Sequence, residues 1–164
     1  MSTMKKLMVF SLISAALMSH SVCADNIKKE RVIPIEVKVS SSVDIKMTTI
    51  DGKSITKIKM LPDAKKPGYY TFSQDIEITT LGMNGKNRLN VLLGKALELI
   101  NDDQQLANIK VHFNGKELNV ASPTLYNTVN NKVSGALKIE ASASSDTKKG
   151  IFKGDLVLQL EEVA

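Results

Sequence analysis

The feature that most constrains this chain is a short alternation of apolar and other residues near its amino terminus. The apolar positions are two residues apart and are Ile33, Ile35, Val37 and Val39. In an extended strand, residues at this spacing all point to the same face. An apolar row of this kind requires a groove to cover it. A strand at the end of a chain suggests a subunit that completes the sheet of a neighbouring copy, rather than an enzyme that works alone.

The first 24 residues have the pattern of a removable secretion signal. Lys5 and Lys6 precede an apolar run over 7–17, and the small-residue sequence Val22-Cys23-Ala24 follows as a cleavage site. The apolar run is shorter than the ~20 residues that a membrane-spanning helix needs. We therefore expect an exported protein whose mature chain begins at Asp25.

Removal of the signal changes the composition in ways that limit the possible functions. Cys23 is the one cysteine of the chain, so the mature domain has no disulfide and no thiol nucleophile. The signal carries two of the 22 basic residues and none of the 17 acidic ones, so the formal net charge falls from +5 to +3. This mild excess does not require nucleic acid or a membrane as a partner. The remaining ~140 residues suffice for one domain with a core.

The rest of the chain has the signals of strands separated by turns. Alternating or apolar runs occur over 43–47, 55–60, 70–78, 109–113, 118–120, 133–139 and 151–160. Asp51-Gly52 and Asn114-Gly115 are tight-turn dipeptides between such runs. The number and spacing of these strands predict an all-β fold of the β-sandwich type.

One stretch, 89–106, also fits a helix. Its apolar residues recur at helical spacing at positions 89, 92, 93, 96, 97 and 100. On propensity alone, 95–107 is predicted to be helical, with Gly94 as a possible break.

The sequence offers no catalytic or metal-binding constellation. After signal removal His112 is the one histidine, and its place between Val111 and Phe113 predicts a solvent-facing strand residue rather than a metal ligand. The adjacent carboxylates at 102–103 and 161–162 are not expected to act as a general acid/base pair, because neighbouring residues point apart on a strand and are usually solvated in a loop. We therefore expect no enzyme activity, no cofactor and no metal.

Lysines at 28–29, 57, 59, 65–66 and 148–149 allow two interpretations. They could form a basic patch for acidic host glycans. The interpretation we favour is that they keep exposed strands soluble and oppose pairing at sheet edges.

Three segments together resemble a known family. IKVHFNGKEL at 109–118, GIFKGDLVLQL at 150–160 and IPIEVKVSSSVDIKM at 33–47, which leads to Asp51-Gly52, are similar to major subunits of the alternate chaperone-usher fimbriae. That group includes the major pilins of the colonisation factor antigen I type and the cable pilins. The similarity extends over essentially the whole mature chain.

The resemblance implies an immunoglobulin-like sandwich that lacks its last strand and is completed by donor-strand exchange. It divides the chain into a signal (1–24), a donor-strand extension (25–40) and a pilin domain (41–164). The implied donor residues are Ile33, Ile35, Val37 and Val39. One wall of the acceptor groove is implied to be Phe152, Leu156, Leu158 and Leu160.

The implied partners are identical subunits in a head-to-tail polymer, a periplasmic chaperone, an outer-membrane usher and a tip adhesin. The implied location is the cell surface, reached through the periplasm, where the fimbria would support adhesion to host cells. The resemblance also changes the prediction for 89–93 to a strand and leaves at most one or two helical turns around 95–100.

Pro34 departs from an ideal donor strand, because proline has no backbone N–H to pair. Its side chain falls on the outward phase, so packing survives. One ladder bond must then be missing, or the insertion must begin near Ile35, and Ile33 is the donor residue that this affects.

Two other classes stay open. One is a monomeric secreted or periplasmic carbohydrate-binding sandwich, which requires the amino-terminal strand to pair within its own sheet. The other is a carboxylate-based hydrolase, which no motif in the sequence supports.

Overall fold

The computed structural model describes residues 33–41, 45–80, 87–147 and 150–164. The predicted signal and the first part of the predicted extension, 1–32, lie outside the described residues. All regular elements in the described ranges are strands, and no helix there could cross a membrane.

Twelve strands occur in the described residues. They are β1 (Ile33–Ser41), β2 (Lys46–Thr49), β3 (Lys57–Pro62), β4 (Tyr69–Thr79), β5 (Arg88–Leu93), β6 (Ile100–Asn101), β7 (Gln104–Gln105), β8 (Ala107–Phe113), β9 (Lys116–Leu118), β10 (Thr124–Asn127), β11 (Lys132–Ser142) and β12 (Gly154–Val163). Every run that the sequence marks as extended overlaps one of these strands.

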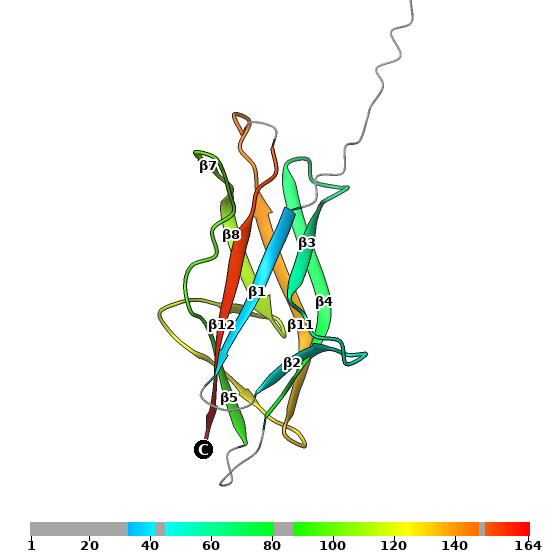
Figure 1. Ribbon diagram of the computed structural model, residues 1–164, viewed down its shortest axis with the longest axis vertical. Coiled ribbons are helices and arrows are strands. Elements are labelled where there is room, and N and C mark those ends of the chain that lie inside the picture. The colour runs from blue at the N-terminus through cyan, green and yellow to red at the C-terminus, as the bar shows by residue number, and fades with distance from the viewer. Residues whose placement is uncertain (1–32, 42–44, 81–86, 148–149) are drawn as a thin grey trace, which may run out of the picture.

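The strands form two layers joined at one side. The hydrogen-bonded order is β10-β5-β12-β1-β3-β4-β11-β8-β9, with β2 added to β4. In Figure 1, β12 and β1 lie in front, and β8 and β11 lie behind them. The pairing is antiparallel throughout this path except between β1 and β12, which run parallel. The predicted all-β, immunoglobulin-like sandwich is confirmed.

The core lies between the layers and follows from alternation along the strands. On β5, Leu89, Val91 and Leu93 are buried while the residues between them are partly exposed. The pairing of β4 with β11 is the longest, from Tyr69 opposite Ser142 to Thr79 opposite Lys132. Because side chains alternate across a strand, one face of each element can supply the core while the other meets water.

The helix expected over 95–107, and the shorter one around 95–100, are absent from the structure. Residues 94–99 run in extended form: Leu97 and Leu99 are buried, while Glu98 and Ile100 between and beyond them are exposed. That is the period of a strand, not of a helix. A Cβ on Gly94 would lie 2.8 Å from Cγ1 of Val157, so close packing of this segment against β12 requires a residue without a side chain here. Tertiary packing therefore overrides the helical spacing.

Candidate interaction groove

The β1 strand lies in a groove of its own chain, between β12 and β3. Seven residue pairs join it to β12, from Ile35 opposite Gly154 to Ser41 opposite Leu160. Four pairs join it to β3, from Ile33 opposite Met60 to Glu36 opposite Lys57. This one strand therefore links the two layers on that side of the sandwich (Figure 1).

The predicted donor residues differ in how deeply they enter the groove. Ile35 is 1% exposed and Val37 is 8% exposed, so both are part of the core. Val39 is opposite Leu158 but is 38% exposed. The side chain of Ile33 lies outside the described residues, although its backbone pairs with Met60. In this arrangement, the middle of the row is the buried part.

The predicted groove wall is buried as a set: Phe152, Leu156, Leu158 and Leu160 are each at most 2% exposed. Leu156, Leu158 and Leu160 lie directly opposite β1 residues. Phe152 precedes β12, which begins at Gly154 rather than at the expected 151. The reason is that Lys153 exchanges two backbone hydrogen bonds of 2.9 Å with Ile100, so this segment pairs with β6 instead.

Pro34 costs β1 no ladder bond at this position. Val37 donates its N–H to the carbonyl of Thr56 (2.9 Å), on the β3 side. Because amide directions alternate along a strand, the nitrogen of Pro34 faces the β12 side. Pairing with β12 starts one residue later, at Ile35. The expected missing bond therefore falls outside the ladder.

A charged pair on the outer surface also joins β1 to β12. Nζ of Lys38 lies 3.2 Å from Oδ2 of Asp155, and Nζ of Lys95 lies 3.6 Å from the same oxygen. These lysines, Lys38 most strongly, hold the pKa of the Asp155 carboxyl below its ordinary value. The pair is exposed, so it helps to orient β1 against β12 but adds little to the stability of the fold.

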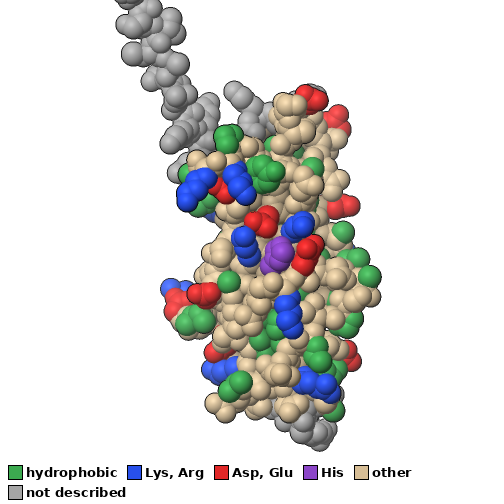
Figure 2. All heavy atoms as spheres, turned by 180° about the vertical axis from the view of Figure 1, so that it is seen from behind, with side chains coloured by type: hydrophobic (Ala, Val, Ile, Leu, Met, Phe, Trp, Pro, Cys, Tyr) green, Lys and Arg blue, Asp and Glu red, His purple; other side chains and the backbone are tan. Residues whose placement is uncertain are grey.

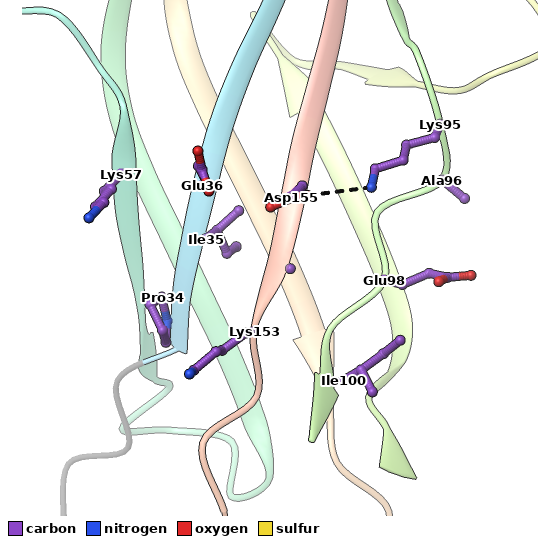
Figure 3. A pocket seen from close by; sticks show the side chains of 11 residues that line it. Pro34, Ile35, Glu36, Lys57, Lys95, Ala96, Glu98, Ile100, Lys153 and Asp155 are labelled. Carbon is purple, nitrogen blue, oxygen red and sulfur yellow. Dashed lines mark ion pairs between the residues drawn. The ribbon is translucent and has the colours of Figure 1, made fainter. Parts of the chain in front are cut away.

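A hollow of about 460 Å³ opens beside the beginning of β1 and β12 (Figure 3). Figure 3 shows Lys57 on one side of β1, and Lys95, Glu98 and Ile100 beyond β12. Its floor includes Gly154, where a Cβ would lie 2.1 Å from the Glu98 carbonyl oxygen. This glycine lets the 94–99 segment lie against β12 at the point where Ile35 enters the core. No motif or alternation in the sequence marks Gly154 or this hollow.

His112 lies on the outer face of β8, between the buried Val111 and Phe113, and basic and acidic side chains surround the histidine in Figure 2. It is half-buried, with Nε2 enclosed and without a hydrogen-bond partner among the described residues, rather than solvent-facing as expected. Its side chain is 23% exposed, and Nε2 lies 3.8 Å from Oε2 of Glu140. Lys138, first, and then His112 hold the pKa of Glu140 below its ordinary value. This is a surface ion-pair cluster.

The adjacent carboxylates do not converge on a catalytic site. Asp102 and Asp103 form the exposed turn between β6 and β7, and Glu161 is exposed while Glu162 is buried on the other face. Within the described ranges no three His, Cys, Asp or Glu side chains gather as metal ligands. Of the lysines considered for a basic patch, those at 57, 59, 65 and 66 are exposed, and the others lie outside the described residues.

The family of the chain follows from comparison with known proteins. The family model described as CS1 type fimbrial major subunit matches residues 29–161, which include β1, its groove and all but the end of β12. The chain belongs to this family. It is thus a structural subunit of a fimbria and not an enzyme, it assembles with identical subunits, and its place is the extracellular pilus.

Among solved structures, the chain is similar to the CooA pilin subunit from enterotoxigenic Escherichia coli. The identity is 14%, the match covers 73% of this chain and 98% of that chain, and the TM-score is 0.46. No curated protein matches the chain.

Proposed function

We propose that fimbrial assembly proceeds by exchange of β1: the strand leaves its own groove and fills the same groove, between β12 and β3, in the next subunit. Ile35 and Val37 would enter the neighbour's core, with Ile33 and Val39 at the two ends of the donor row. Phe152, Leu156, Leu158 and Leu160 would form the acceptor wall. The donor extension would be 25–40 and the acceptor domain 41–164.

The observation that carries the proposal is that a terminal strand is paired on both sides and buried at its centre. A terminal element can be exchanged between copies without new types of contact, because the contacts within one chain are reproduced between two. The exchange is head to tail, so it does not close on itself and continues as a filament.

An open groove that captures β1 of another copy gains enough free energy for a stable link, whereas a closed chain must first lose the same contacts with its own strand. Burying a Val or Ile side chain stabilises by about 1.5–3 kcal/mol, so Ile35 and Val37 together supply roughly 3–6 kcal/mol before ordering costs. Backbone pairing with two strands adds to this. The total is a large fraction of the stability of a small domain.

An emptied groove exposes apolar side chains and two unpaired strand edges, which is an aggregation hazard. For this reason the proposal includes a periplasmic chaperone that covers the groove after export by the signal at 1–24. It also includes an outer-membrane usher where exchange occurs, and a tip adhesin at the end of the fibre. The fibre would support adhesion to host cells, with host glycans as candidate ligands.

The position of β1 also meets the requirement of the monomeric carbohydrate-binding alternative, since the strand pairs within its own sheet. Membership of a fimbrial family favours the closed chain as a form that precedes polymerisation rather than as the final state. Size-exclusion chromatography separates the two: a binding module elutes as one monomeric species at all concentrations.

The test removes the donor without touching the acceptor. Deletion of 25–39, or Val37→Asp, should give a subunit that binds its chaperone but forms no fibres, because a charge cannot enter the apolar groove unpaired. Glu36→Gln, at an exposed position of the same strand, is the matched control and should polymerise normally.

A synthetic peptide of residues 31–41 supplied to the deleted subunit should raise its melting temperature. Normal fibres from the Val37→Asp variant, or a deleted subunit that melts as a compact monomer with no gain from the peptide, would refute the donor assignment.

A further inference from the structure

We propose a second contact between copies of this chain: the turn after β2, with Ile50 at its tip, docks into a hollow beside β9 on another copy. The inference rests on the proposed function in that it places this contact within the fibre. It concerns residues that neither β1 nor its groove uses.

The docking element is a rigid turn with an exposed apolar tip. Ile50 is 63% exposed, although it directly follows β2. Three hydrogen bonds fix the turn: Thr49 N–H to the Lys53 carbonyl (2.9 Å), Gly52 N–H to the Thr49 carbonyl (2.8 Å), and Lys53 N–H to Thr49 Oγ1 (3.1 Å). Gly52 has a φ of 81°, which this turn needs. A preformed turn loses little conformational entropy when it binds.

Two charges flank the tip. Nζ of Lys53 lies 2.6 Å from Oδ2 of Asp51, and both side chains are more than half exposed. Their hydrogen bond lowers the pKa of Asp51 and raises that of Lys53, so both remain charged around neutral pH. The turn therefore presents one apolar side chain beside one negative and one positive group.

The receiving hollow has the complementary arrangement. It is about 220 Å³ and is lined mainly by apolar side chains, among them Leu93, Leu97, Ile109, Leu118 and Val120. A cavity of about 150 Å³ accepts a molecule the size of benzene, so one branched aliphatic side chain fits this hollow.

Lys110 and Glu117 also line this hollow, with Nζ and Oε2 3.7 Å apart. With Ile50 in the hollow, Asp51 can face Lys110 and Lys53 can face Glu117. Complementary charges around an apolar anchor fix the register of a contact.

The two surfaces lie on opposite sides of the molecule. In Figure 1 the turn after β2 projects at the right, and the yellow loop after β9, which borders the hollow, projects at the left. The turn of one chain therefore cannot reach the hollow of the same chain. Two chains joined this way leave one turn and one hollow unoccupied at the ends. The contact suits a continuing array rather than a closed dimer.

Engineered cysteines test the contact in assembled fibres. The double variant Ile50→Cys with Val120→Cys should form disulfides between copies under mild oxidation, giving a ladder of dimers and larger species on a non-reducing denaturing gel. Val120 lines the hollow and is half exposed, so both positions tolerate substitution. The control pair Ile50→Cys with Leu61→Cys, exposed positions outside the hollow, should give at least tenfold less cross-linking.

The outcomes separate this inference from donor exchange. Fibres of normal appearance that give no more cross-linking than the control pair would overturn the second contact and leave donor exchange intact. Failure of the Val37→Asp test, with a strong ladder in the cysteine variant, would overturn donor exchange alone. As an independent readout, Ile50→Asp should keep the melting temperature of the subunit but shorten the fibres severalfold, whereas unchanged fibre length counts against the contact.

Discussion

Lys38 on β1 lies 3.2 Å from Asp155 on β12, so an ion pair spans the seam at which the terminal strand meets the last strand. Val37 precedes Lys38 and Leu156 follows Asp155. These two side chains point to the inner face and lie opposite one another in the core. The seam thus has an apolar inner side and a charged outer side, and only the outer side responds to pH.

Stability should depend on Asp155 in acid. Its pKa is lowered in the folded chain by Lys38 and then Lys95, so its contribution is present above the unfolded value of about 3.9 and is lost as pH falls through the folded value. The urea midpoint of the wild type should modestly exceed that of Asp155→Asn at pH 6, and the difference should shrink as the pH falls below about 4. Lys38→Gln should add little in the Asp155→Asn background. A difference that does not shrink as the pH falls would contradict this assignment.

Tyr126 should report on the packing between β10 and β8. Its hydroxyl donates to the Phe113 carbonyl (2.8 Å), and burial raises its pKa to about 12. Tyr126→Phe should destabilise the domain by about 1–2 kcal/mol, because a buried carbonyl loses its partner. Tyr69→Phe, at an exposed position, should have no measurable effect on the same urea denaturation curve.

The raised pKa of Tyr126 has its own signature. The neutral hydroxyl contributes stability fully below the unfolded value of about 10, and this contribution is lost as pH rises towards about 12. In an ultraviolet titration, wild type and Tyr126→Phe should therefore develop equal phenolate absorbance up to about pH 11. An excess in the wild type near pH 10 is the result that contradicts burial of this hydroxyl.

Gly154 should not tolerate a side chain. A Cβ there would lie 2.1 Å from the Glu98 carbonyl oxygen, so β12 or the 94–99 segment must shift. Gly154→Ala should cost about 1–3 kcal/mol by overpacking and should loosen β1, whose Ile35 is opposite this position. Hydrogen exchange of the β1 amides measures the loosening, and Lys153→Ala, at the exposed neighbour, is the control. Unchanged exchange in Gly154→Ala would show that the two strands are not coupled there.

Proline should be tolerated at position 34 but not at position 35. Pro34→Ala should lower stability by only about 0.4–1 kcal/mol, because it frees the unfolded chain without restoring a ladder bond. Ile35→Pro also deletes a buried side chain and an N–H that faces β3, so it should destabilise by about 3 kcal/mol or more. Equal effects of the two variants, measured by urea denaturation, would contradict the amide directions inferred for β1.

The strands were predictable because their cause is local. Apolar alternation and turn dipeptides identify the runs, and Asn114-Gly115 does adopt positive φ at both residues, as a two-residue hairpin turn needs. The prediction for 95–107 failed for a non-local reason. Leu97 and Leu99 are buried by strands distant in sequence, and apolar residues at 92, 93, 96 and 100 happened to match a helical spacing as well.

The candidate site was predictable in outline only. The apolar rows of β1 and β12 could be read from alternation, and their roles as donor and groove wall are proposed from the family resemblance. Nothing local distinguishes Val37 from Val39, which differ in exposure. The role of Gly154 depends on a carbonyl at residue 98, a contact that no sequence pattern encodes. The hollow beside β9 likewise combines residues from three separate segments.

The short connection between β1 and β2 has a kinetic consequence for fibre growth. β1 ends at Ser41 and β2 begins at Lys46, so the tether holds the strand near its own groove at an effective concentration on the order of millimolar. A free subunit at micromolar concentration competes poorly with that tether. Growth from closed chains is therefore limited by how often β1 leaves its own groove, and a pool of finished monomers would be a slow source of fibre.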